Sequence, residues 1–216
     1  MEKIVTYSYS ALAILLLFAS VNLSHALEVT VTDQDGKPIQ DAVIYVTLGK
    51  GASTKNENPI TVDQVDKEFA PYMTAIQAGS RINFPNNDKI RHQVYSFSDT
   101  KQFEIPLYSG TPSDPVLFEK PGVVALGCNI HDWMTAYIFV ANSPYFAITD
   151  KNGKAEIKNL TKGEYNIEAW HPTAKGDAKD SRQSTAATTT LNFTLTTKPV
   201  WRAWRAPSNA NTGGYR

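Results

Sequence analysis

The chain has 216 residues with 21 basic and 21 acidic side chains, so its formal net charge is zero. Hydrophobic residues make up 42% and charged residues 19% of it, which is typical of a globular protein and excludes a disordered one. The balanced charge argues against nucleic acid as the main partner, because phosphate binding needs a basic excess. A single cysteine excludes an internal disulfide framework, a zinc ribbon and any four-thiolate cluster.

Residues 1–26 predict a cleavable export signal. Lys3 provides a positive start, residues 11–19 (ALAILLLFA) form an apolar run, and residues 24–26 (SHA) form a small-x-small cleavage site. The apolar run is shorter than the roughly 18–20 residues that a membrane span needs, and no cysteine follows it as in a lipoprotein signal. We therefore expect a soluble periplasmic protein. A lone Cys128 in that oxidising compartment has to be buried or bound to metal to avoid oxidation.

Short strand signals follow one another along the rest of the chain. Residues 27–32 (LEVTVT) and 42–48 (AVIYVTL) flank an Asp-Gln-Asp-Gly turn and predict a hairpin, and residues 50–58 predict a loop. Long helical periodicity is absent, so the sequence predicts an all-β sandwich or barrel. Further strands are predicted at residues 60–65, 74–77, 81–84, 92–97, 123–126, 135–140, 145–149, 155–157, 163–170 and 188–196.

The two ends of the chain carry the same turn motif. Asp33-Gln-Asp-Gly36 and Asp150-Lys-Asn-Gly153, with the later G-x-Y-x-I strand, resemble the carboxypeptidase-regulatory-like β-sandwich, although Ala42 stands where that family more often has glycine. The resemblance implies one discontinuous domain, residues 27–57 plus 144–197, with a second β-sandwich at residues 58–143 inserted into it. The alternative is a single large sandwich that shares strands.

A set of metal-binding side chains marks the inserted segment. Residues 127–134 (GCNIHDWM) contain Cys128, His131 and Met134, and His92 follows an Asn-Asn-Asp stretch upstream. One thiolate, two imidazoles and one thioether are the donors of a mononuclear blue-copper site. We expect Cys128 at the end of a strand and a tight loop that brings His131 and Met134 back towards it.

The C-x-x-H-x-x-M pattern resembles the cupredoxins, with a ligand loop similar to that of amicyanin. Residues 68–96 support the resemblance through an F-x-P segment, a glycine turn and a strand that ends in F-x-N-x-D before the histidine. The resemblance, over residues 62–140, implies a cupredoxin Greek-key sandwich that binds one type 1 copper ion. His92, Cys128 and His131 are then the equatorial ligands and Met134 the weak axial one. With its flanks, the chain resembles periplasmic proteins labelled methylamine-utilisation proteins.

One position departs from the cupredoxin pattern. Cupredoxins usually have Asn or Ser after the first histidine, where it ties the ligand loop to the sandwich, and this chain has Gln93. Asn87 and Asp88 are the alternative residues for that tie, along with Asn86. Trp133 and Tyr137 are expected beside the loop, either as packing residues or as a docking surface for a partner.

These observations predict a periplasmic carrier of single electrons between a donor and an acceptor protein. The alternatives are a copper-handling protein without electron transfer and a carbohydrate- or protein-binding module. An enzyme is not expected, because His92, His131 and His171, the histidines left after signal removal, are too few for additional copper centres. Residues 198–216 form a basic, aromatic tail that is either unstructured or an arm for an acidic partner or membrane surface.

Overall fold

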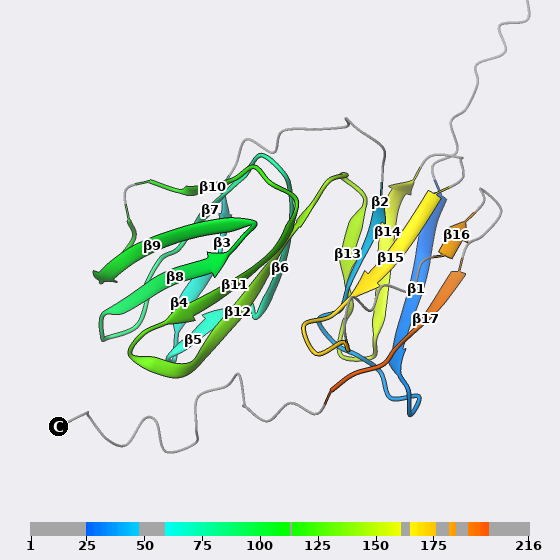
Figure 1. The fold of residues 1–216 in the computed structure, drawn as a ribbon, viewed down its shortest axis with the longest axis horizontal. Coiled ribbons are helices and arrows are strands. Elements are labelled where there is room, and N and C mark those ends of the chain that lie inside the picture. The colour runs from blue at the N-terminus through cyan, green and yellow to red at the C-terminus, as the bar shows by residue number, and fades with distance from the viewer. Residues whose placement is uncertain are drawn as a thin grey trace, which may run out of the picture.

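The computed structural model describes residues 25–47, 59–112, 114–160, 165–175, 182–184 and 190–198. Almost all of the expected signal, the loop at residues 50–58 and nearly all of the tail lie outside these residues. Within them the chain is all-β and contains no helix, as the sequence predicted. The strands form two pairs of facing sheets, set side by side (Figure 1). None of the described segments forms a helix long and apolar enough to cross a membrane.

The first pair of sheets, here called the central sandwich, comes from the middle of the chain. A five-stranded sheet in the order β6-β12-β11-β8-β9 faces a three-stranded sheet in the order β10-β7-β3, and the hairpin β4-β5 lies beside them. The strands are β3 (Ile60–Thr61), β4 (Asp63–Val65), β5 (Glu68–Ala70), β6 (Met73–Gln77), β7 (Ser80–Asn83), β8 (His92–Ser98), β9 (Lys101–Tyr108), β10 (Val116–Phe118), β11 (Gly122–Cys128) and β12 (His131–Ala141).

Alternation along β12 explains how this sandwich is filled. Met134, Ala136 and Ile138 point into its apolar core, whereas Tyr137 and Phe139 point to the opposite face of the sheet. Residues from both sheets complete the core, including Phe84 and Phe118. The five-stranded sheet is therefore apolar on both faces along the second half of β12.

The second pair of sheets, here called the flanking sandwich, joins the two ends of the chain. Its sheets have the orders β14-β1-β17 and β13-β2-β15-β16 and enclose a separate apolar core. The strands are β1 (His25–Asp33), β2 (Val43–Thr47), β13 (Phe146–Ile148), β14 (Lys154–Leu160), β15 (Tyr165–Trp170), β16 (Arg182–Ser184) and β17 (Thr190–Leu195). Among the described residues the two sandwiches share no strand.

The predicted hairpin of the first two strands is wrong. β1 pairs with β14 and β17, whereas β2 pairs with β13 and β15 in the other sheet. The reason is that β2 is buried on both faces: Ile44 and Val46 enter the flanking core, while Val43 and Tyr45 pack towards the central sandwich. A continuous apolar run is typical of such a strand, whereas β1 alternates between buried and more exposed residues.

Aromatic rings fill the contact between the two sandwiches. The ring centroid of Phe139 on β12 lies 4.5 Å from that of Tyr45 and 5.7 Å from that of Trp170, both in the flanking sandwich. Tyr137 continues the cluster, 6.0 Å from Trp170 and 5.6 Å from Tyr72. This dry contact covers one end of the five-stranded sheet and leaves the other end, where β8 begins and β11 ends, for the site described next.

Candidate metal centre

Three strands of the five-stranded sheet bring the candidate ligands together. His92 is the first residue of β8, Cys128 the last of β11 and His131 the first of β12. Cys128 pairs directly with His131 across a turn formed by Asn129 and Ile130. The expected ligand loop is therefore shorter than predicted, because β12 starts at His131 itself.

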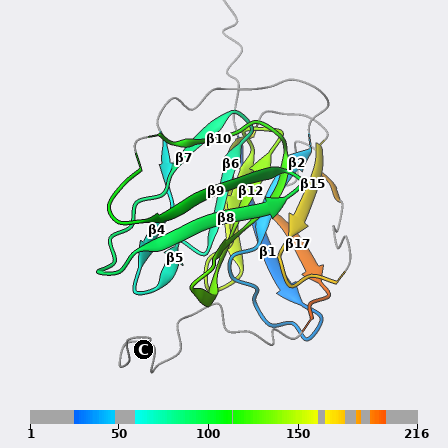
Figure 2. The same cartoon turned by 60° about the vertical axis from the view of Figure 1, so that its left-hand side comes forward.

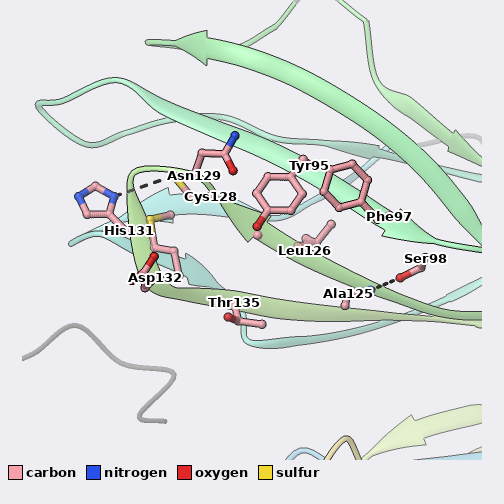
Figure 3. A pocket seen from close by; sticks show the side chains of 12 residues that line it. Tyr95, Phe97, Ser98, Ala125, Leu126, Cys128, Asn129, His131, Asp132 and Thr135 are labelled. Carbon is pink, nitrogen blue, oxygen red and sulfur yellow. Dashed lines mark hydrogen bonds between the residues drawn. The ribbon is translucent and has the colours of Figure 1, made fainter.

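The donor atoms of these residues converge on one point. The Sγ atom of Cys128 lies 3.9 Å from Nδ1 of His92 and 3.9 Å from Nδ1 of His131, and the three donors lie within 4.8 Å of one another. Figure 3 shows Cys128 and His131 pointing towards each other at the tip of the β11–β12 turn. All three side chains are buried, with exposed fractions of 4% or less.

The spacing fits a single transition-metal ion. Metal–sulfur and metal–imidazole bonds measure about 2.3 and 2.1 Å in zinc proteins, so a sulfur and a nitrogen on one ion are at most about 4.4 Å apart. Both sulfur–nitrogen distances here are below that limit. One soft thiolate and two imidazoles suit copper as well as zinc, and exclude a hard cation such as calcium or magnesium.

Met134 lies close to these donors in the chain and in space. It is on β12, is 1% exposed and belongs to the core cluster that also contains Cys128. Its side chain lines the same pocket as Cys128 and His131, a pocket of about 460 Å³. Because β12 starts at His131, Met134 lies on a strand, beside a shift in the β11–β12 register, and not in the loop that we expected.

Hydrogen bonding lowers the pKa of the Cys128 thiol in spite of its burial. Burial alone raises the pKa of the thiol, but the hydrogen bond from His92 and the backbone amides of Gln93 and Ile130 hold that pKa below its ordinary value. Burial lowers the pKa of His92, and its contacts with Cys128 and Asp88 outweigh burial and raise it. For His131, burial and the nearby positive charges of His92 and Lys67 lower the pKa, which favours the neutral imidazole that binds metal.

The three residues predicted to hold the ligands in place occupy different positions. The carboxylate of Asp88 lies 2.7 Å from Nε2 of His92, on the side of the ring opposite to Cys128. Asn87 donates its amide to Asp63 at 2.7 Å, and Gln93 donates its side-chain amide to Glu104 at 2.6 Å. Only Asp88 among them contacts a candidate ligand through its side chain, and Gln93 acts through its backbone.

Trp133 and Tyr137, both expected beside the loop, lie in different places. The Trp133 ring centroid is 5.0 Å from that of His131, and its indole nitrogen donates to the carbonyl of Lys67 at 3.0 Å. Tyr137 instead packs between Tyr72 and Trp170 in the contact between the two sandwiches. Distance along the strand explains the separation, because Tyr137 is six positions beyond His131 on β12, about 20 Å along an extended strand.

Sequence reasoning did not find the role of Tyr95. Its ring lies across Gly127, its partner in the β8–β11 pairing and the residue before Cys128. A Cβ atom added to Gly127 lies 2.6 Å from the Tyr95 ring, so a larger residue requires the ring or β11 to move. Figure 3 shows Tyr95 and Phe97 side by side on β8 at the edge of the pocket, and Phe97 is 78% exposed. The glycine directly before Cys128 is the sequence feature that could have indicated this close packing.

No protein-family model matches the chain, and no curated protein matches it. Several solved structures align with part of the chain. A copper-containing nitrite reductase from Thermus scotoductus SA-01 aligns at 25% identity and a TM-score of 0.38, over 45% of this chain and 25% of the reductase. A purple cupredoxin from Nitrosopumilus maritimus aligns at 19% identity and a TM-score of 0.33, over 38% of this chain and 98% of that protein. A reduced mutant of amicyanin aligns at 14% identity and a TM-score of 0.35, over 45% of this chain and 97% of amicyanin.

Proposed function

We propose that the chain is a type 1, or blue, copper protein that carries single electrons between a donor and an acceptor protein in the periplasm. His92, Cys128 and His131 bind one copper ion equatorially, and Met134 is the weak axial ligand. The observation that carries the proposal is the convergence of one buried cysteine sulfur and two buried imidazole nitrogens from three neighbouring strands.

Copper supplies one-electron chemistry by alternating between Cu(II) and Cu(I). The protein would supply a set of ligand atoms whose positions change little between the Cu(II) and Cu(I) states. The donors come from strand ends that are fixed by backbone pairing, and the Gln93 and Ile130 amides hold the cysteine sulfur in place. A rigid, dry site of this kind keeps the structural change on electron transfer small.

Trp133 is the proposed point of electron entry or exit. His131 is only 3% exposed, so its own edge offers little surface to a partner. The half-buried Trp133 ring packs against it and is the aromatic group next to it towards the outside. Tyr137 is not part of this proposal, because it packs between the two sandwiches.

Burial of the donors also bears on the copper-handling alternative. A protein that passes copper on needs ligands that the recipient can reach, whereas His92, Cys128 and His131 are all enclosed. This favours retention of the metal and therefore electron transfer. The two functions differ in rates: a carrier exchanges electrons quickly and releases copper slowly, and a handling protein does the opposite.

The cellular location is proposed from the sequence alone. Residues 1–26 have the composition of an export signal, and cleavage there gives a mature chain that starts at Leu27. N-terminal sequencing of protein recovered from the periplasm tests this, and a start at Met1 in the cytoplasm contradicts it. We also interpret the flanking sandwich as a carboxypeptidase-regulatory-like domain that supports the copper domain.

Optical and paramagnetic-resonance spectra of the Cu(II)-loaded protein test the proposed function. We expect one copper per chain and an intense thiolate-to-copper band in the red part of the visible spectrum. Cys128→Ser should lose the band completely, and Met134→Leu should shift it. Met73→Leu, at a buried methionine in the contact between the sandwiches, is the matched control and should leave the band unchanged. A colourless wild-type protein, or a band that survives in Cys128→Ser, contradicts the proposal.

A further inference from the structure

The β4–β5 hairpin ends in a tight turn that lies against the metal-site end of the central sandwich. Val65 pairs with Glu68, so the turn consists of Asp66 and Lys67, whose φ angles are 54° and 60°. Two consecutive positive φ angles define a type I′ turn, which strongly prefers Asn-Gly. Figures 1 and 2 both show β4 and β5 at the end of the five-stranded sheet where β8 begins.

The turn holds His92 through Asp88. The backbone amides of Asp66 and Lys67 donate to the two carboxylate oxygens of Asp88, at 3.1 and 2.8 Å. The oxygen that accepts from Lys67 also accepts from Nε2 of His92, at 2.7 Å. If Nδ1 of His92 binds a metal, the imidazole proton stays on Nε2 and donates to Asp88, so this contact supports the ring orientation that turns Nδ1 towards Cys128.

The same turn also holds His131, through Trp133. The carbonyl of Lys67 accepts the indole N–H of Trp133 at 3.0 Å, and the Trp133 ring packs on the His131 ring with centroids 5.0 Å apart. The backbone amide of Lys67 therefore supports the His92 imidazole through Asp88, and its carbonyl supports the His131 imidazole through Trp133. The two histidines come from different strands, and this turn connects the outer sides of both.

We propose that the Asp66–Lys67 turn is a positioning device that sets the orientation of both imidazoles and so controls how firmly copper is held. The inference rests on the proposed function. The contacts that carry it come from backbone groups of the turn, so the proposed device depends on the backbone shape that the turn residues allow. Loosening the turn should free Asp88 and Trp133 together and let both rings rotate away from the sulfur.

Two double variants with the same change of charge separate turn shape from side-chain identity. Asp66→Val with Lys67→Val places β-branched residues at positive φ, which opens the turn, whereas Asp66→Asn with Lys67→Gly installs the preferred type I′ pair. Both remove one negative and one positive charge. We expect the Val-Val protein to release Cu(I) to a chelator roughly tenfold faster or more, in line with the 10–100-fold effect of lost ligand support, and the Asn-Gly protein to match the wild type.

A second background tests whether the turn acts through the two named residues. In a protein that carries Asp88→Ala and Trp133→Phe, both links are absent, and the Val-Val and Asn-Gly turns should release copper at the same rate. Equal rates for the two turns in the otherwise wild-type protein overturn the inference. So does a rate difference that persists unchanged in the background without the links.

A measurement on the metal-free protein tests the role of the turn whether or not the protein binds copper. In the metal-free wild-type and Asn-Gly proteins, the Trp133 indole proton should exchange slowly with solvent in NMR spectra, and in the Val-Val protein it should exchange quickly. Failure of the wild type to bind copper refutes the proposed function, while the indole exchange still tests the turn. An indole proton that is equally protected in the Val-Val protein overturns the inference whether or not copper binds.

Discussion

The two sandwiches of this protein bury polar side chains to different extents. In the central sandwich His92, His131 and Asn86 are all buried, and the two imidazoles face a shared point with Cys128. In the flanking sandwich the core is apolar, and the buried Thr149 donates to the carbonyl of Ile39 and accepts from an adjacent backbone amide. Buried polar groups need partners. Thr149 and Asn86 find theirs in the nearby backbone, whereas His92, His131 and Cys128 face one another and are suited to binding an ion.

Removal of copper should produce the largest difference between the two sandwiches. Binding to the folded state alone adds about 4 kcal/mol of stability when free metal is about 1,000 times the Kd. Hydrogen exchange should therefore slow on copper loading in β11 and β12, which carry ligands, and change little in β1 and β14. Equal protection in both sandwiches shows that copper binds elsewhere or stabilises the protein as one cooperative unit.

Truncation of Phe139 should weaken the connection between the sandwiches. Phe139 is 6% exposed and contacts Tyr45 and Trp170 across the boundary. Phe139→Ala should cost about 3–5 kcal/mol, the range for buried aromatic residues, and should split thermal unfolding into two transitions. Phe193→Ala, at a fully buried position of the flanking core, is the control and should lower the midpoint of the single transition without splitting it. A single shared transition in Phe139→Ala contradicts this account.

A methyl group at Gly127 should disturb the copper site from inside the sheet. The added Cβ lies 2.6 Å from the Tyr95 ring, so the ring or β11 has to move. We expect Gly127→Ala to cost about 1–3 kcal/mol, as overpacking does, and to shift the thiolate-to-copper band because Cys128 is the next residue. Tyr95→Ala in the same protein should restore most of the loss. If the double variant is no better than Gly127→Ala, the contact with Tyr95 is not the cause.

The last expected effect concerns His171, which lies in the flanking sandwich and changes only the pH dependence of stability. Burial lowers its pKa to about 4, and its Nδ1 lies 2.7 Å from the Thr173 hydroxyl. The unfolded chain, with an ordinary pKa near 6.5, therefore binds this proton more readily than the folded chain. Its contribution to the unfolding free energy is complete above pH 6.5 and is lost as the pH falls towards 4. Denaturant titrations should give a shallower pH dependence for His171→Gln, and identical slopes contradict the assignment.

Local sequence patterns predicted the strands that carry the site better than they predicted sheet membership. Alternation identified most of β8, β11 and β12, because each has one face in a core. β9 was not predicted, although its exposure alternates. It is an edge strand that contains Pro106 and charged residues, which are uncommon in central strands. The hairpin error had a different origin: the buried second face of β2 depends on the contact between the sandwiches, which no local pattern records.

Residue type and spacing selected the donor set, and the structure brings His92, Cys128 and His131 together. The support of the two imidazoles was harder to predict. Asp88 was one of three candidates, and the sequence contains nothing that distinguishes it from Asn87 as the partner of His92. The Asp66–Lys67 turn could not be predicted from the sequence. Type I′ turns are recognised by an Asn-Gly pair, which this turn lacks, and its contacts come from its backbone.

X-ray absorption at the copper edge of the loaded wild-type protein tests the central claim most directly. The account predicts one sulfur and two imidazole nitrogens around a single copper, with the short sulfur contribution absent in Cys128→Ser. Copper surrounded only by nitrogen and oxygen in the wild type contradicts it, since the thiolate of Cys128 is then not a ligand.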